Sequence, residues 1–225
     1  MNINIIPGSF KPPHKGHLSL VENIIKRNSI NDMIVIIISK KPRCLDKSFL
    51  YVEQKSKLEL QNALIKYLPL NETHILQLTK EKILILIKEL IEKKVLKTIN
   101  AEQSYNIWSI YIKYLKKKYK TMPKIVLRIA ENNNIMLDTD RVIVDIFRKR
   151  PVIKGVYLMK SMKNEKNSRF NFLERKYKKY IKTLLFKNIK DIDATEMREH
   201  ILNKNKKGFM NYLPKNMSEY SKNKI

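Results

Sequence analysis

The chain has 225 residues, of which 43% are hydrophobic, a single cysteine, four histidines and a formal net charge of +26. This length suits one domain with a sizeable core, and a lone thiol excludes an intrachain disulfide and argues against a resident zinc site. The apolar runs are shorter than the ~20 residues of a transmembrane helix, and the first run is too short for a signal peptide. We therefore expect a cytoplasmic protein, kept reduced and with no membrane attachment.

The first predicted elements are a strand, a turn and a helix. Residues 3–6 form an apolar run typical of a buried strand, and residues 18–25 repeat apolar side chains at helical spacing. A turn between a strand and a helix directs backbone N–H groups and the positive end of the helix dipole toward an anion. His14 and His17 share one face there, with Gly16 allowing close approach, so both imidazoles can reach one phosphate group. The alternative is that they are ordinary loop or cap histidines.

A second buried strand is predicted over residues 33–38, which are almost continuously apolar and β-branched. A basic turn with Lys40 and Arg43 follows it. In an open parallel sheet, the loops at the carboxyl ends of the strands line the ligand crevice. Lys40, Lys41 and Arg43 are therefore candidate phosphate contacts, and the alternative is a basic surface turn.

The middle of the chain is expected to be mainly helical. Apolar spacing predicts helices over residues 52–68 and 83–95, with a short strand over 73–78 between them. Residues 98–103 carry side chains typical of a helix start, ahead of a helix that contains Trp108.

The second half of the chain alternates strands and helices. We expect strands over residues 124–130 and 152–159, and helices over 138–147 and 172–186. This alternation predicts an α/β fold, a Rossmann-like open parallel sheet flanked by helices. Residues 215–225, rich in lysine, asparagine and serine, are expected to form a flexible basic tail.

The run Gly8-Ser9-Phe10-Lys11-Pro12-Pro13-His14-Lys15-Gly16-His17 resembles the His-x-Gly-His motif of the nucleotidyltransferase superfamily. That superfamily contains nicotinamide-mononucleotide and phosphopantetheine adenylyltransferases and several cytidylyltransferases. A bare His-x-Gly-His is a weak signal, whereas the flanking glycine and prolines, after a first strand and before a helix, make this one specific. The helix that begins near Ala101 is similar to one that follows the second strand closely in some relatives, which implies a helical insertion over residues 44–97.

Residues 192–198, Ile-Asp-Ala-Thr-Glu-Met-Arg, resemble the superfamily's second motif, I-S-[SGA]-T-x-x-R. Thr195 can cap a helix and offer a hydroxyl to a phosphate, and Arg198 falls on the same face, where its planar fork suits bidentate phosphate binding. Asp193 departs from the usual serine and places a negative charge beside the expected triphosphate. Residues 209–214 resemble the small helical cap that closes relatives of the adenylyltransferase type.

The resemblance implies that residues 1–214 form a nucleotidyltransferase domain. It would move a nucleoside monophosphate from an NTP to a small phosphate-bearing acceptor and release pyrophosphate, with Mg²⁺ carried by the NTP. ATP is the favoured donor, and CTP stays open. The implied catalytic residues are His14, His17 and Lys11; the implied nucleotide-binding residues are Gly8, Ser9, Phe10, Gly16, Lys40, Arg43, Thr195 and Arg198.

Two other classes of function stay open at this point. A scaffold that has lost catalysis and binds nucleic acid would account for the net charge of +26. A nucleotide sensor would keep the phosphate site without turnover. Non-specific affinity for polyanions is expected in either case, and the sequence leaves an oligomer open.

Overall fold

The computed structural model describes residues 1–68, 71–149, 153–161, 170–186 and 194–225. The strands are β1 (Asn2–Gly8), β2 (Met33–Ile38), β3 (Arg43–Cys44), β4 (Thr98–Ile99), β5 (Lys124–Ile129), β6 (Gly155–Ser161) and β7 (Ile181–Phe186). The α-helices are α1 (Lys15–Arg27), α2 (Lys57–Ile65), α3 (Glu72–Gln77), α4 (Lys80–Glu92), α5 (Ala101–Lys118), α6 (Ile135–Lys149), α7 (Asn171–Lys176), α8 (Ala194–Leu202), α9 (Lys206–Met210) and α10 (Glu219–Lys222). Short 3-10 helices lie at Lys47–Phe49 and Val52–Gln54.

The centre of the molecule is a parallel five-stranded sheet in the order β5-β2-β1-β6-β7. In the middle strand, Ile5 pairs with Val35 of β2 on one side and with Leu158 of β6 on the other. Because β2 and β6 lie on opposite sides of β1, the strand order reverses at β1. Open parallel sheets bind ligands outside the carboxyl ends of the strands at such a switch point. The predicted Rossmann-like α/β fold is confirmed.

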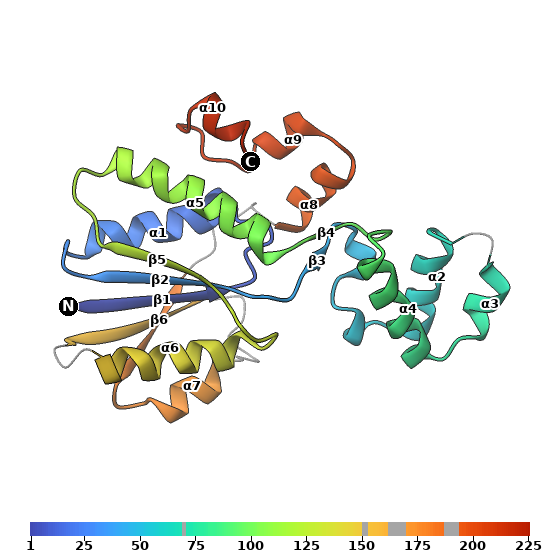
Figure 1. The fold of residues 1–225 in the computed structure, drawn as a ribbon, viewed down its shortest axis with the longest axis horizontal. Helices are drawn as coiled ribbons and strands as arrows, with labels where there is room; N and C mark the ends of the chain where they lie inside the picture. Colours follow the sequence, from blue (N-terminus) through green and yellow to red (C-terminus); the bar gives the residue numbers. More distant parts are fainter. Residues whose placement is uncertain (69–70, 150–152, 162–169, 187–193) are drawn as a thin grey trace.

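Helices cover both faces of this sheet, α1 and α5 on one and α6 and α7 on the other (Figure 1). Alternate residues of β2 serve the two cores: Ile34 and Ile36 pack in the cluster with α1 and α5, while Val35 and Ile37 pack in the cluster with α6. Burial on both faces explains why this strand is a continuous apolar run. None of the helices in the described ranges is long and apolar enough to cross a membrane.

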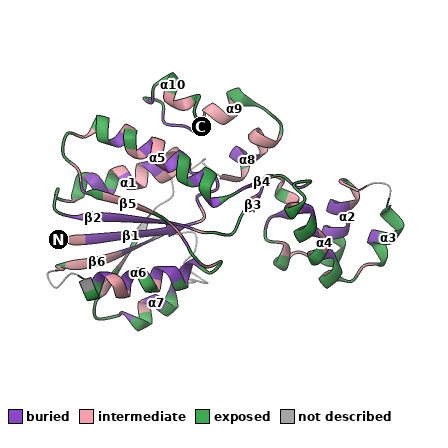
Figure 2. Cartoon of the chain, in the orientation of Figure 1, coloured by how far each residue is buried: buried purple, intermediate pink, exposed green. Residues whose placement is uncertain are grey.

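Residues 44–97 form a helical unit that extends from the carboxyl end of the sheet beyond the two-stranded β3–β4 ribbon (Figure 1). It has its own core, in which Leu60, Leu64 and Ile83 are fully buried. Figure 2 shows this burial on the inner sides of α2 and α4, with exposed residues outside. That the unit is an insertion, as the resemblance of the motifs implies, stays a prediction.

Two predictions for this unit need correction. The strand predicted over residues 73–78 is wrong, because α3 is helical and its backbone carbonyls at Ile75 and Leu76 accept hydrogen bonds from the buried Gln61 amide. The helix predicted from residue 52 begins at Lys57, where Ser56 and Glu59 form a reciprocal capping box.

The C-terminal part also differs from the predictions. The helix predicted over residues 172–186 ends at Lys176, and β7 then pairs in parallel with β6 along its whole length. The strand predicted from residue 152 begins at Gly155, and residue 152 itself lies outside the described ranges.

Residues 215–225, predicted to be a flexible tail, instead contain α10 and bury Met217 against the α1–α5 core. Although the residues around them are mostly polar, Met217 and Ile225 pack against the α1–α5 core, and burial of their apolar surface stabilises this segment.

Candidate active site at the carboxyl end of β1

The phosphate loop, residues 9–14, joins the end of β1 to the start of α1 and is held from both sides. The hydroxyl of the buried Tyr111 on α5 donates to the Pro13 carbonyl at 3.2 Å. From the C-terminal cap, the Tyr212 carbonyl accepts the Lys15 amide N–H at 2.8 Å. The loop is thus fixed by segments far away in sequence, as preorganised binding requires.

Gly8 and Phe10 shape the entrance of the loop. A Cβ on Gly8 would lie 2.5 Å from the Phe10 ring, so only glycine fits beneath this side chain. Phe10 itself has φ of 48°, a left-handed conformation unfavourable for a bulky residue. Its ring packs edge-on against His17 at 5.0 Å and Trp108 at 5.5 Å between centroids. Such strain at a site fixed by packing is typical of functional loops.

His14 and His17 form a reciprocal capping box at the start of α1. His14 Nδ1 accepts the Gly16 N–H at 3.1 Å, and His17 Nδ1 accepts the His14 N–H at 3.2 Å. Because both Nδ1 atoms are acceptors, the neutral tautomer of each ring carries its proton on Nε2. The rings stack with their centroids 3.7 Å apart.

The two histidines therefore do cap α1, as the alternative interpretation expected. This role is compatible with phosphate binding and supports it. Capping fixes both imidazole rings at the positive end of a helix, where anions bind. Burial, with the charge of His14 as the second cause, holds the pKa of His17 well below its usual range. At neutral pH His17 is thus an uncharged hydrogen-bond donor.

Lys11 is buried, with 1% of its surface exposed, and its ammonium donates to the Ser39 carbonyl just past β2. Burial, followed by the nearby charge of Arg43, lowers the pKa of Lys11 to about 8. Arg43 belongs to the same cluster, because its Nε donates to Ser9 Oγ at 3.4 Å. Its guanidinium also lies 4.9 Å from the ring centre of Tyr51 in the helical unit.

The second motif meets the first through Arg198, which is buried on α8. Its Nη1 donates to the Lys11 carbonyl at 2.7 Å, and its Nη2 donates to Thr195 Oγ1 at 2.9 Å. Each contact uses one of the two N–H bonds that the terminal nitrogen carries. Thr195 is the second residue of α8, inside the first turn, so the prediction that it is the N-cap is wrong. Asp193 lies outside the described residues.

Most of the predicted site residues are thus brought together, but Lys40 is not. Its Nζ donates to the Glu131 carbonyl beyond β5, on the side of the sheet away from β1. Three contacts that hold the loop were not predicted from the sequence, those of the Ser39 carbonyl, Tyr111 and Tyr212. Only the position of Ser39 directly after a predicted strand could have indicated its role.

Lys11, Arg43 and Arg198 converge on the loop, where the two imidazoles add N–H donors. In the part of the chain that the structure describes, no group of three or more His, Cys, Asp or Glu side chains could hold a metal ion. The arrangement is suited to binding a polyphosphate.

Known proteins resemble this chain to different extents. A 66-residue stretch is 33% identical to the phosphopantetheine adenylyltransferase of Aquifex aeolicus, covering 29% of this chain and 36% of that relative. A solved structure from Francisella tularensis, a bifunctional NMN adenylyltransferase/ADP-ribose pyrophosphatase complexed with AMP and a Mn ion, is more distant. It is 14% identical with a TM-score of 0.42, over 96% of this chain and 45% of that one.

The family profile described as Cytidylyltransferase-like matches residues 5–200, which include both motifs, the second half of β1 and the other four strands of the central sheet. The resemblance of the two motifs to the nucleotidyltransferase superfamily is thereby confirmed, and the chain belongs to the cytidylyltransferase-like family.

Proposed function

We propose that the protein is an enzyme that transfers a nucleoside monophosphate from an NTP to a small phosphate-bearing acceptor and releases pyrophosphate. AMP is the favoured group, and CMP is the second candidate. The observation that carries this proposal is the capping box of His14 and His17, which follows directly on the loop whose Lys11 carbonyl accepts a hydrogen bond from Arg198.

The chemistry needs little beyond positioning. An acceptor phosphate oxygen, already an anion, attacks the α-phosphorus; a new P–O bond forms as the bond to the β-phosphate oxygen breaks, and pyrophosphate leaves. No general base is required, because the attacking oxygen carries no proton. Catalysis then depends on in-line placement and on donors aimed at the charge that develops on the phosphates.

Each residue has a task in this scheme. Neutral His17 hydrogen-bonds the α-phosphate, and His14 does so at the β-phosphate. Lys11 stabilises charge at the α-phosphate or the acceptor, and Arg198 with Thr195 holds the β- and γ-phosphates. The Arg198 bond to the Lys11 carbonyl places the second motif directly against the phosphate loop. Mg²⁺ enters with the NTP.

Thermal unfolding with each NTP and Mg²⁺ tests the proposal. Selective stabilisation by ATP in the wild type, lost in His17→Ala, is the expected result, because a ligand of the folded state raises the Tm. Pyrophosphate release in a screen of phosphorylated acceptors then identifies the acceptor.

A response to CTP alone would name CMP as the transferred group. No response to any NTP, together with salt-dependent RNA or DNA binding that survives His17→Ala, would overturn the proposal in favour of a nucleic-acid-binding scaffold. NTP binding without pyrophosphate release from any acceptor would favour a nucleotide sensor.

A further inference from the structure

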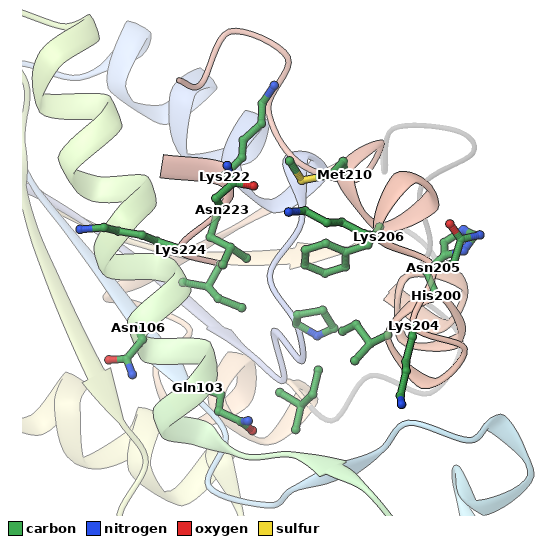
Figure 3. A pocket seen from close by; sticks show the side chains of 16 residues that line it. Gln103, Asn106, His200, Lys204, Asn205, Lys206, Met210, Lys222, Asn223 and Lys224 are labelled. Carbon is green, nitrogen blue, oxygen red and sulfur yellow. The ribbon is translucent and has the colours of Figure 1, made fainter. Parts of the chain in front are cut away.

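A cavity of about 520 Å³ lies between the start of α5, the α8–α9 segment and the C-terminal residues (Figure 3). Pro12 is the phosphate-loop residue in its wall, and the histidines and arginine of the candidate active site do not line it. This cavity is therefore a second concave site, in contact with the loop but distinct from the cluster around His17.

The walls of the cavity are apolar. Ile99 and Ile107 are 6% and 8% exposed and form its side toward the sheet. Phe209 and Met210 of α9 line it while also packing against the α1–α5 core, and Ile225 does the same from the chain end. An uncharged ligand group placed here would be removed from water on several sides.

The rim of the cavity is basic. Lys204, Lys206, Lys222 and Lys224 line it, and no acidic side chain is found among its described lining residues. Lys222 pairs with Glu219 at 2.8 Å. Figure 3 shows Lys206 extending from α9 toward the segment that carries Lys222 and Asn223. Lys206 has no acidic partner within ion-pair distance among the described residues.

Apolar walls beneath a lysine rim define the chemistry of the ligand. The walls favour an uncharged ring or chain, and the lysines favour an anionic group at one end of it. The volume lies within the range of roughly 300–1,000 Å³ that is usual for small-molecule sites. Inorganic phosphate alone would leave the apolar surface unused.

We propose that this cavity is a second binding site for a phosphorylated small molecule with an apolar or aromatic body, and that Lys206 binds its phosphate. The site does not depend on nucleotidyl transfer at the phosphate loop. It is nevertheless close to it, because Pro12 belongs to the loop and α8 carries both Arg198 and the lining residues His200 and Ile201.

Equilibrium dialysis at physiological ionic strength tests the proposal with three probes: AMP, hexyl phosphate and inorganic phosphate. The key pair of variants is Lys206→Glu and Lys207→Glu. Both residues are exposed on α9 and both changes lower the net charge equally, but only Lys206 lines the cavity. Asn106→Trp, at an exposed lining position, fills the cavity as a second variant.

We expect Lys206→Glu to weaken AMP or hexyl phosphate binding about tenfold or more, the scale of one charge-assisted hydrogen bond, while Lys207→Glu leaves binding near the wild-type level. Asn106→Trp should abolish it. Binding of hexyl phosphate but not AMP would show that the ligand has an aliphatic body, and binding of AMP but not hexyl phosphate would show that it has an aromatic one. Either result supports the proposal.

Three results would overturn it: equal effects of the two charge reversals, binding of inorganic phosphate as tight as that of the larger probes, or no binding of AMP and hexyl phosphate. His17→Ala separates the two sites. If AMP binding is lost in His17→Ala and retained in Lys206→Glu, the phosphate loop is the only site. The opposite pattern keeps the cavity and removes the proposed active site.

Discussion

The sheet region and the helical unit of residues 44–97 are stabilised in different ways. In the sheet region, charged groups such as Lys11 and Arg198 are buried beside the core and bonded to backbone carbonyls. In the helical unit the buried side chains are almost all apolar, with Gln61 as the buried polar residue reported there. Burying a charge is costly unless it is paired or hydrogen-bonded, and groups of this kind gather at functional sites, so the contrast supports the proposal that the chemistry belongs to the sheet region.

The connection between the two regions is narrow. The β3–β4 ribbon and the Lys47–Glu199 ion pair join them, and Tyr51 reaches back to the guanidinium of Arg43. The helical unit therefore folds around its own core while contacting the edge of the site. We expect chemistry and stability to separate along this boundary.

The largest effect is expected from Leu64→Ala, because Leu64 is fully buried in the core of the helical unit. A cavity of this kind costs about 2–5 kcal/mol. Hydrogen exchange should show the loss of protection in α2 and α4 and little change in β1. The matched control is Leu58→Ala on the same helix, since Leu58 is 62% exposed. Equal loss of protection in β1 would mean that the two regions share one cooperative core.

His17→Ala should lower turnover by roughly 10²–10³-fold, the scale for losing one preorganised donor at a developing charge. Steady-state pyrophosphate release measures this. His74→Ala is the control, because His74 is an exposed histidine in the helical unit, away from the loop. Near-normal turnover in His17→Ala, or an equal loss in His74→Ala, would contradict the assignment.

Arg198→Ala should weaken NTP binding about ten- to a hundredfold and Thr195→Ala less, because the arginine contributes charge as well as hydrogen bonds. Titration calorimetry with the NTP measures both. Arg198 also holds the Lys11 carbonyl, so its removal should lower the Tm as well. If the two variants bind NTP equally, the second motif serves only to start α8.

Lys11 gives a pH dependence of known sign. Because its pKa is lowered to about 8, its positive charge is lost as pH rises through this value. We expect kcat/KM to fall about tenfold between pH 7 and 9 if that charge stabilises the reacting phosphate. Lys11→Arg, which stays charged, should show a lower rate without this fall. A fall of the same size in Lys11→Arg would assign it to another group.

The same group acts on stability in the opposite direction. Between pH 8 and its usual value of 10.5, the unfolded chain holds the Lys11 proton and the folded chain does not. The free energy of unfolding contributed by Lys11 therefore rises with pH in this window. Denaturant unfolding of the wild type and of Lys11→Met at several pH values measures this contribution. The difference between their free energies of unfolding should change with pH only between about 8 and 10.5.

Local patterns account for the parts that the sequence predicted well. The strands at residues 3–6 and 33–38 are buried on both faces and so appear as apolar runs. His14 and His17 could be proposed as a pair because side chains three residues apart share one face at a helix start. The contact of Arg198 with Lys11 spans 187 positions, and the motifs indicated only that the two residues belong to one nucleotide site.

Non-local contacts account for what the sequence did not predict. Residues 181–186 follow a lysine run typical of a helix, and their strand exists because β6 offers a parallel partner. Helix propensity alone could not predict α3, because a helix this short is not stable by itself. The Gln61 amide of α2 holds it in place by donating to its backbone carbonyl at Ile75. Met217 is ordered because the α1–α5 core has room for it, which composition cannot show.

The smallest effect is expected at the boundary itself. Lys47 and Glu199 pair at 2.9 Å, but their side chains are 68% and 35% exposed, so water and salt screen the pair. Lys47→Ala should therefore change kcat/KM less than about twofold and leave the Tm close to that of the wild type. A larger loss of activity with an unchanged Tm would show that the helical unit positions α8, and with it Arg198, through this contact. In that case the helical unit would take part in catalysis, because a charge in its 3-10 helix Lys47–Phe49 would control the phosphate site.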